Sequence, residues 1–72
     1  MTDEIRTKFG KRMRKLRRMQ DLTQEQLSEK SGVSSDFISQ IERGLNSPSL
    51  DTIQKLADGL GVPIEELFHF SS

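Results

Sequence analysis

The 72-residue sequence contains no cysteine, no tryptophan and no tyrosine, and it has a single histidine, His69. Without cysteine no disulfide can form, and one histidine leaves too few ligands for a structural zinc site. Chains below about 80 residues often depend on such a staple or on a partner. We therefore expect tight packing between elements, helped by self-association, and no metal or cofactor.

Long apolar runs are missing as well. No stretch approaches the ~20 apolar residues that a membrane span needs, and the polar, charged segment after Met1 lacks the apolar region of a signal peptide. A phosphate-binding glycine loop and a nucleophile–base arrangement are also lacking. These absences favour a soluble, cytoplasmic protein that is neither an enzyme nor the receptor of a small molecule.

The formal net charge is zero, but the charges are unevenly distributed. Residues 1–19 contain eight basic side chains against two acidic ones, and the remainder contains three basic against nine acidic, so the parts carry +6 and −6. This asymmetry suggests a basic face directed at a polyanion. A helix that is simply solvated by Lys and Arg would give the same count, so both interpretations stay open.

The spacing of apolar residues predicts helices along the whole chain and gives no strand alternation. The first helix is expected to end near Gln20, with an apolar stripe of Ile5, Phe9, Met13, Leu16 and Met19. A second, short helix is predicted after Thr23, which forms a capping-box pattern with Gln26, and it should stop at Gly32.

Three further helices follow from the same signals. Ser34 caps the third, which ends at Gly44 and faces inward through Ile38, Ile41 and Leu45. Ser49 caps the fourth, whose buried residues are expected to be Leu50, Ile53, Leu56, Ala57 and Leu60. A short fifth helix has Pro63 in its first turn and carries Ile64, Leu67 and Phe68. We expect a single all-α domain over residues 1–70, with residues 71–72 as a tail.

The break at Gly32 is the most informative feature of the pattern. Two short helices joined by a three-residue, glycine-containing turn can pack at a steep angle, which defines a helix-turn-helix unit over residues 23–42. Such a mount lets the N-terminal end of the third helix enter a DNA major groove about 12 Å wide. The turn at Gly32 is therefore expected to leave the N-terminal end of the third helix exposed, and Val33 is expected to anchor the turn in the core.

The segment LTQEQLSEKSGVSSDFISQIERG, residues 22–44, resembles the helix-turn-helix of the Cro/phage-repressor (XRE) family. The resemblance continues through NSPSLDTIQKLADGLGVPIEELF, residues 46–68, and reaches back to Phe9 in the first helix. It implies a compact, five-helix, lambda-repressor-like domain. It also implies a transcriptional regulator, of the repressor or controller kind, that binds a palindromic double-stranded DNA operator as a homodimer.

By similarity to the family, residues 34–43 form the recognition helix and its end, and the residues expected to read bases are Ser35, Asp36, Phe37, Ser39 and Gln40. Gln40 suits adenine, Asp36 can accept from cytosine, and Phe37 can pack on a thymine methyl group. Plainer roles stay open for all five. Ser35 and Asp36 can serve as helix caps, Phe37 can belong to the core margin, and Ser39 and Gln40 can be solvated polar positions.

The family pattern also implies contacts with the phosphate backbone, from Gln24, Arg14, Arg43 and Asn46. Gln24 begins the second helix, where a side-chain amide and the helix N-terminus can bind the same phosphate. Arg17 and Glu42 match a family pair that forms a structural salt bridge between the first helix and the end of the third.

One short recognition helix reads few base pairs, so two copies on two half-sites are expected. The predicted dimer contact consists of the late apolar residues Ile64, Leu67, Phe68 and Phe70, with residues 45–50 as a second region. Leu67 and Phe68 can instead close the monomer core. The alternative function is that of a protein-binding member of the fold, such as an antitoxin or a transcription bridging factor, which the zero net charge keeps open.

Overall fold

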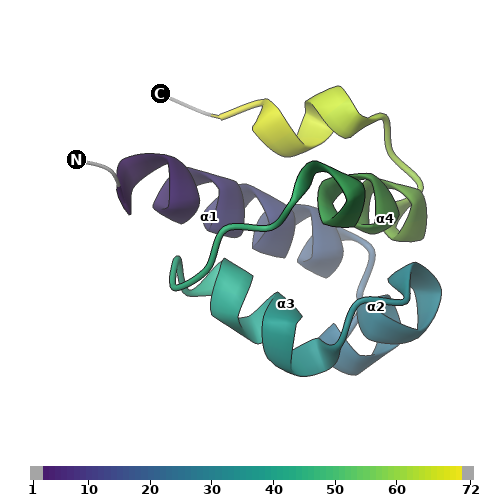
Figure 1. Ribbon diagram of the computed structural model, residues 1–72. Coiled ribbons are helices and arrows are strands. Elements are labelled where there is room, and N and C mark those ends of the chain that lie inside the picture. The colour runs from purple at the N-terminus through teal and green to yellow at the C-terminus, as the bar shows by residue number, and fades with distance from the viewer. Residues whose placement is uncertain (1–2, 71–72) are drawn as a thin grey trace.

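The computed structural model describes residues 3–70, and every regular element in that part of the chain is helical (Figure 1). Four α-helices, α1 (Asp3–Met19), α2 (Gln24–Ser31), α3 (Ser35–Glu42) and α4 (Leu50–Leu60), precede a 3₁₀ helix, η1 (Ile64–Phe68). Within these residues no helix has the length and apolar character to cross a membrane. The all-α prediction is confirmed. The fifth segment differs in type, and the predicted tail lies outside the described residues.

The helices begin where the sequence supplies a cap. The Thr23 hydroxyl accepts the N–H of Gln26 at 3.0 Å, and the Gln26 side chain accepts the N–H of Thr23 at 2.8 Å. Ser34 and Ser49 each accept the N–H three residues further on. These bonds satisfy backbone donors that a helix leaves without an internal partner, so the three predicted starts are correct.

The turn of the helix-turn-helix unit depends on Gly32. Its φ of +78° is left-handed, and its N–H closes α2 on the carbonyl of Ser28 at 2.8 Å. A side chain is strained in this conformation, whereas glycine adopts it freely. Val33, the next residue, is buried, so the turn is anchored to the core as expected.

A single apolar core lies between the helices. In Figure 1, α1 and α4 lie between the α2–α3 pair on one side and η1 on the other. The core residues come from every element: Phe9, Met13, Leu16, Leu27, Val33, Ile38, Ile41, Ile53, Leu56, Ala57, Leu60 and Leu67.

The predicted apolar stripes are correct in their centres and wrong at their ends. Ile5 and Met19, near the two ends of α1, are exposed, and so are Leu45 and Leu50 on either side of the turn between α3 and α4. The 17 residues of α1 span about 25 Å, twice the length of the eight-residue α3 that packs on it. Its ends therefore extend beyond the elements that would cover them.

A close backbone approach fixes α3 against α1. Gly10 lies opposite the last turn of α3, and a Cβ atom built there would be 2.2 Å from the carbonyl oxygen of Ile41. The two helices can reach this separation only because position 10 has no side chain. The angle at which α3 is presented thus depends on this contact.

Candidate nucleic-acid interface

Helix α3 lies at the edge of the bundle (Figure 1). Its inner face carries Ile38 and Ile41, which are fully buried. The polar members of the expected base readers are exposed or partly exposed: Ser35, Asp36, Ser39 and Gln40. The structure therefore leaves these polar side chains accessible along one short helix.

Phe37 differs from the other four residues. It is partly buried, as Ser39 and Gln40 are, but its side chain packs against the apolar core. Its N–H donates to the capping hydroxyl of Ser34 at 3.2 Å. Phe37 therefore lies at the margin of the core, which is the alternative to base reading named for it above.

Arg17 and Glu42 form the expected ion pair between α1 and the end of α3. Nε and Nη2 of Arg17 donate to the two carboxylate oxygens of Glu42 at 2.7 and 2.9 Å, and Nη1 donates to the Leu22 carbonyl at 2.6 Å. The two side chains are only 10% and 4% exposed. The hydrogen bond that Arg17 donates to Glu42 raises the pKa of Arg17 against the opposing effect of burial, so the guanidinium stays charged.

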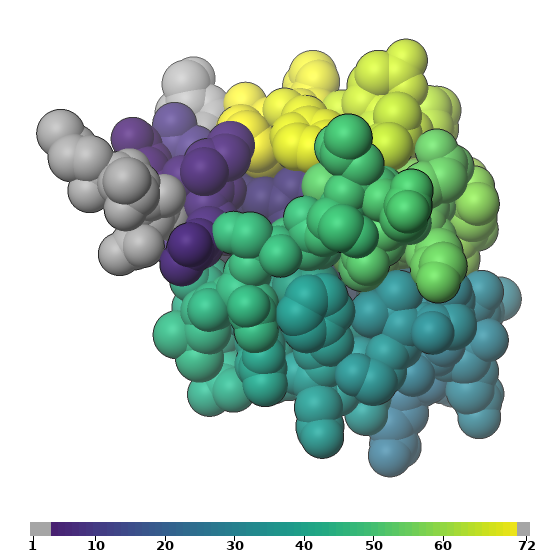
Figure 2. Space-filling model, in the orientation of Figure 1, coloured from purple at the N-terminus to yellow at the C-terminus, as the bar shows by residue number. Residues whose placement is uncertain are grey.

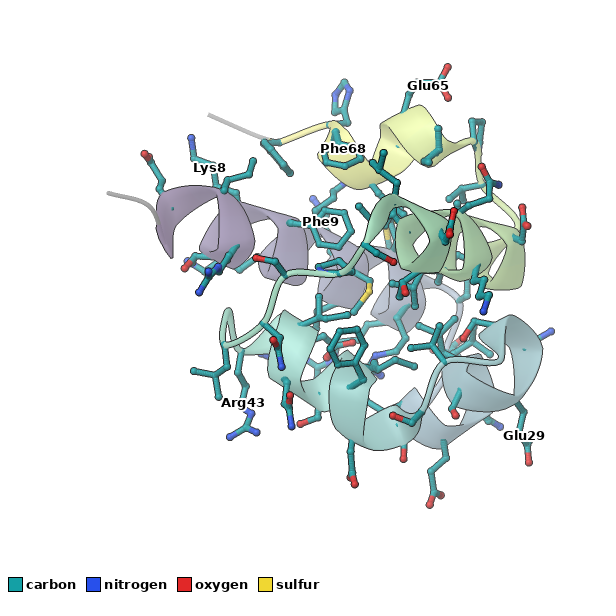
Figure 3. All side chains as sticks on the ribbon, viewed as in Figure 1. Lys8, Phe9, Glu29, Arg43, Glu65 and Phe68 are labelled. Carbon is teal, nitrogen blue, oxygen red and sulfur yellow. The ribbon has the colours of Figure 1, made fainter. Side chains whose placement is uncertain are left out.

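The ion pair lies in the wall of a surface hollow of about 210 Å³. The hollow is lined by Arg14, Arg17, Gln24, Ser39, Glu42 and Arg43. Three of the four residues expected to contact phosphate thus meet here, from α1, from the start of α2 and from the position just after α3. Gln24 Nε2 donates to Glu42 Oε1 at 3.2 Å, a contact that sequence analysis missed. Arg43 extends outward from the end of α3 in Figure 3.

Asn46, the fourth expected phosphate residue, lies elsewhere. It follows α3 in the turn toward α4, and its Nδ2 donates to Oε1 of Gln40. It also lines a second hollow, beside Phe9 and Phe68, rather than the one around Arg17. The structure therefore pairs Asn46 with an expected base reader.

The late apolar residues require a correction. Leu67 is fully buried in the monomer core and has no surface with which to contact a second copy. Phe70, expected to be exposed, is partly buried against the core, and its ring meets that of Phe68 edge-on at 6.2 Å. Ile64 also packs against the core. Helical spacing identifies an apolar face but does not show whether the monomer itself covers that face.

Phe68 is the late apolar residue that keeps a large exposed fraction, 44%. Its ring stacks obliquely on Phe9 with centroids 5.2 Å apart, as Figure 3 shows. Together with Ile5, Pro48 and Ile53 it lines the second hollow, of about 130 Å³. Figure 2 shows the first turns of α1, the turn after α3 and the segment around η1 meeting on this face.

The basic side chains of α1 are divided among several tasks. Arg12 donates to the main-chain and carboxylate oxygens of Glu66, both at 2.8 Å, and so fastens η1 to α1. Lys8 pairs with Glu4 at 3.4 Å. Arg14 reaches the hollow beside α3, whereas another surface depression is lined by Lys11, Arg14, Lys15, Arg18 and Met19. Only part of the expected basic face therefore adjoins α3.

Comparison with known proteins agrees with this geometry. A helix-turn-helix family model matches residues 13–67. Over its full length the chain is 37% identical to the control protein C.BamHI of Bacillus amyloliquefaciens and covers 90% of that relative. It is also 42% identical, over 82% of its length, to the cryptic phage CTXphi transcriptional repressor RstR of Vibrio cholerae, of which it spans 53%.

Among solved structures, the restriction-modification controller protein C.AhdI from Aeromonas hydrophila has a TM-score of 0.86 and 41% identity. The match covers 88% of this chain and 96% of that protein. The chain therefore belongs to the XRE-type helix-turn-helix family, a family of DNA-binding transcriptional regulators rather than enzymes.

Proposed function

We propose that this regulator binds a palindromic operator as a homodimer, with α3 of each copy in the major groove. The observation that carries the proposal is the convergence of Arg14, Gln24 and Arg43 on one hollow at the side of α3. Phosphate contacts set the register and orientation of a protein on duplex DNA. A set of donors beside the exposed residues of α3 is the arrangement that such docking requires.

The proposed roles follow from position and chemistry. Ser35, Asp36, Ser39 and Gln40 are accessible on α3 and are assigned to base edges. Phe37 can reach a thymine methyl only with the exposed part of its ring. Gln24, held by Glu42, is assigned to a phosphate at the N-terminus of α2.

The second hollow is the proposed contact between the two copies. Phe68 and Ile5 line it, and Leu50, which is 79% exposed, lies at the start of α4 close to the segment that completes it. Burying these side chains against a second copy would remove apolar surface from water. A two-fold dimer of this kind would place two α3 helices on half-sites about one DNA turn apart.

The likeness to C.BamHI and C.AhdI, both of which the chain covers almost completely, supports a role as a controller-type regulator. The repressor RstR supports transcriptional repression as the effect. An operator-binding protein of these types acts in the cytoplasm of a prokaryotic cell. We therefore assign the protein to that compartment as part of the proposal.

Selection of bound sequences from a random duplex pool, combined with the solution mass of the protein, tests the proposal. We expect one palindromic site, a dimer mass and a steep fall in affinity with salt, because binding releases counterions. Gln24→Ala should weaken all sequences alike, and Gln40→Ala should relax base preference at one position of each half-site. Gln54→Ala, on the exposed surface of α4, is the matched control and should change neither.

Absence of any enriched sequence would contradict operator binding. For a protein-binding member of the fold, the expected result is instead a DNA affinity that changes little with salt and no footprint on duplex DNA.

A further inference from the structure

We propose that Asn46 is a positioning residue that sets the orientation of the Gln40 amide for base reading. The inference rests on the proposed function, because it assigns a partner to one of the base readers. The geometric basis is the hydrogen bond from Asn46 Nδ2 to Gln40 Oε1. Both side chains are partly buried at the surface of α3.

The backbone holds the two residues together. The N–H of Gly44 donates to the Ile41 carbonyl at 2.9 Å, and the N–H of Leu45 donates to the Gln40 carbonyl at 2.9 Å. The chain thus folds back over the last turn of α3 and returns Asn46 to the level of Gln40. The position of Asn46 relative to Gln40 is therefore set by the end of the helix and not by a free loop.

The chemical consequence lies in the ambiguity of a glutamine side chain. A primary amide has one oxygen acceptor and one NH₂ donor, and a half-turn about its last torsion exchanges them. Asn46 carries the same two amide groups, and in the structure it turns its Nδ2 donor to Gln40, whose Oε1 faces it. The Nε2 donor is then directed to the groove, where it matches an acceptor such as purine N7, guanine O6 or thymine O4.

The location of Asn46 separates this role from a phosphate contact. The other expected phosphate residues, Arg14, Gln24 and Arg43, line the hollow around Arg17. Asn46 lines the second hollow, with Phe9 and Phe68. One N–H of its amide donates to Gln40.

Two substitutions test the inference by sequence selection and by binding to single-base variants of the preferred site. A good side-chain contact to a base discriminates by roughly tenfold or more. Asn46→Ala should reduce that discrimination to about twofold at the position that Gln40→Ala also affects, while affinity for random-sequence DNA and the salt slope stay unchanged. In the Gln40→Ala background, Asn46→Ala should have no further effect, since the two residues act as one unit.

Asn46→Asp is the sharper variant because it keeps the size of the side chain and removes its donor. Gln40 must then donate Nε2 to the carboxylate and present Oε1 to the groove. The preferred base at that position should change to one that offers an amino group, adenine N6 or cytosine N4. The added negative charge lowers affinity for all sequences, but the ratio between sequences is unaffected by it.

Gln54→Ala, on the exposed surface of α4 and outside both hollows, is the matched control and should leave the preference unchanged. Circular dichroism checks that each variant is folded. Equal weakening of all sequences by Asn46→Ala, or an unchanged base preference in both Asn46 variants, would overturn the inference while leaving operator binding intact. If the unmodified protein selects no site, the proposed function and this inference are both overturned.

Discussion

Arg17 is a charged residue that holds parts of the fold together instead of facing solvent. Its guanidinium joins the end of α1 to Glu42 in α3 and to the Leu22 carbonyl before α2. Its pKa is raised by the Glu42 hydrogen bond. A raised pKa gives stability that is complete below the unfolded-state value and is lost only as pH rises through the higher folded-state value. For an arginine both values are strongly alkaline, so this contribution is constant across ordinary pH.

Removing the acidic partner tests how much the ion pair contributes to the free energy of unfolding. Glu42→Ala leaves the Arg17 charge buried without its counter-charge, and we expect the free energy of unfolding to fall by about 3 kcal/mol. Urea denaturation followed by circular dichroism measures it. Glu4→Ala breaks the exposed pair with Lys8 and should change stability by no more than about 0.5 kcal/mol. Equal effects of the two substitutions would contradict a structural role for Glu42.

The candidate site was predictable where the family pattern fixes backbone positions. Arg14, Gln24 and Arg43 were expected from that pattern, and they meet at one hollow. The bonds from Gln24 to Glu42 and from Asn46 to Gln40 were not expected, because they depend on how side chains orient after packing. A family resemblance indicates which positions in the chain carry a function. It does not show which side chains bond to each other after folding.

At the level of the elements, local signals predicted the starts of the helices and tertiary contacts decided the rest. The capping residues Thr23, Ser34 and Ser49 act within three residues, so their effects can be read from sequence. The exposure of Met19 and Leu50 depends instead on where neighbouring elements end.

The 3₁₀ form of the last element was not predicted either. In η1 the Glu66 N–H bonds to the Pro63 carbonyl, three residues back, at 2.9 Å. Pro63 caps the segment instead of entering its first turn. Five residues are too few for apolar spacing to separate a period of 3.0 from one of 3.6, and short 3₁₀ pieces are common as connectors.

The packing of α1 on α3 gives a prediction that opposes helix propensity. Alanine is the better helix former by about 1 kcal/mol, yet Gly10→Ala would place its Cβ 2.2 Å from the Ile41 carbonyl oxygen. Because the obstacle is backbone, the two helices must move apart. We expect the free energy of unfolding to fall by about 1–3 kcal/mol, measured by urea denaturation.

Lys11→Ala, at the next position on the exposed surface of α1, is the matched control and should leave stability within about 0.5 kcal/mol. The Gly10→Ala variant should also bind operator DNA more weakly, since the angle of α3 changes with the helix separation. A stability equal to that of the unmodified protein would show that α1 and α3 can separate without loss.

At the scale of the whole molecule, part of the basic charge of residues 1–19 is paired with acidic residues from later in the chain. Arg12 and Arg17 bind Glu66 and Glu42, so they hold η1 and α3 to α1 rather than facing a partner. Arg14 and Arg43 remain beside the exposed residues of α3. A zero net charge is thus compatible with a locally basic docking surface.

The proposed dimer gives the last prediction, because exposed apolar residues occur both near the second hollow and away from it. Phe68 lines the second hollow and Leu50 follows its lining residue Pro48 by two positions, whereas Met19, 68% exposed, lies at the other end of α1 beside Arg18. Leu50→Glu and Phe68→Glu should each shift the protein to the monomer mass in sedimentation experiments, since a charge would be buried at the contact.

Met19→Glu makes the same chemical change on an exposed side chain away from the second hollow, and it should leave the dimer intact. The monomeric variants should still bind one half-site but lose the added affinity of the palindrome, because the second half-site is then bound independently. Dimers of unchanged stability in both Leu50→Glu and Phe68→Glu would place the contact between copies on a different surface.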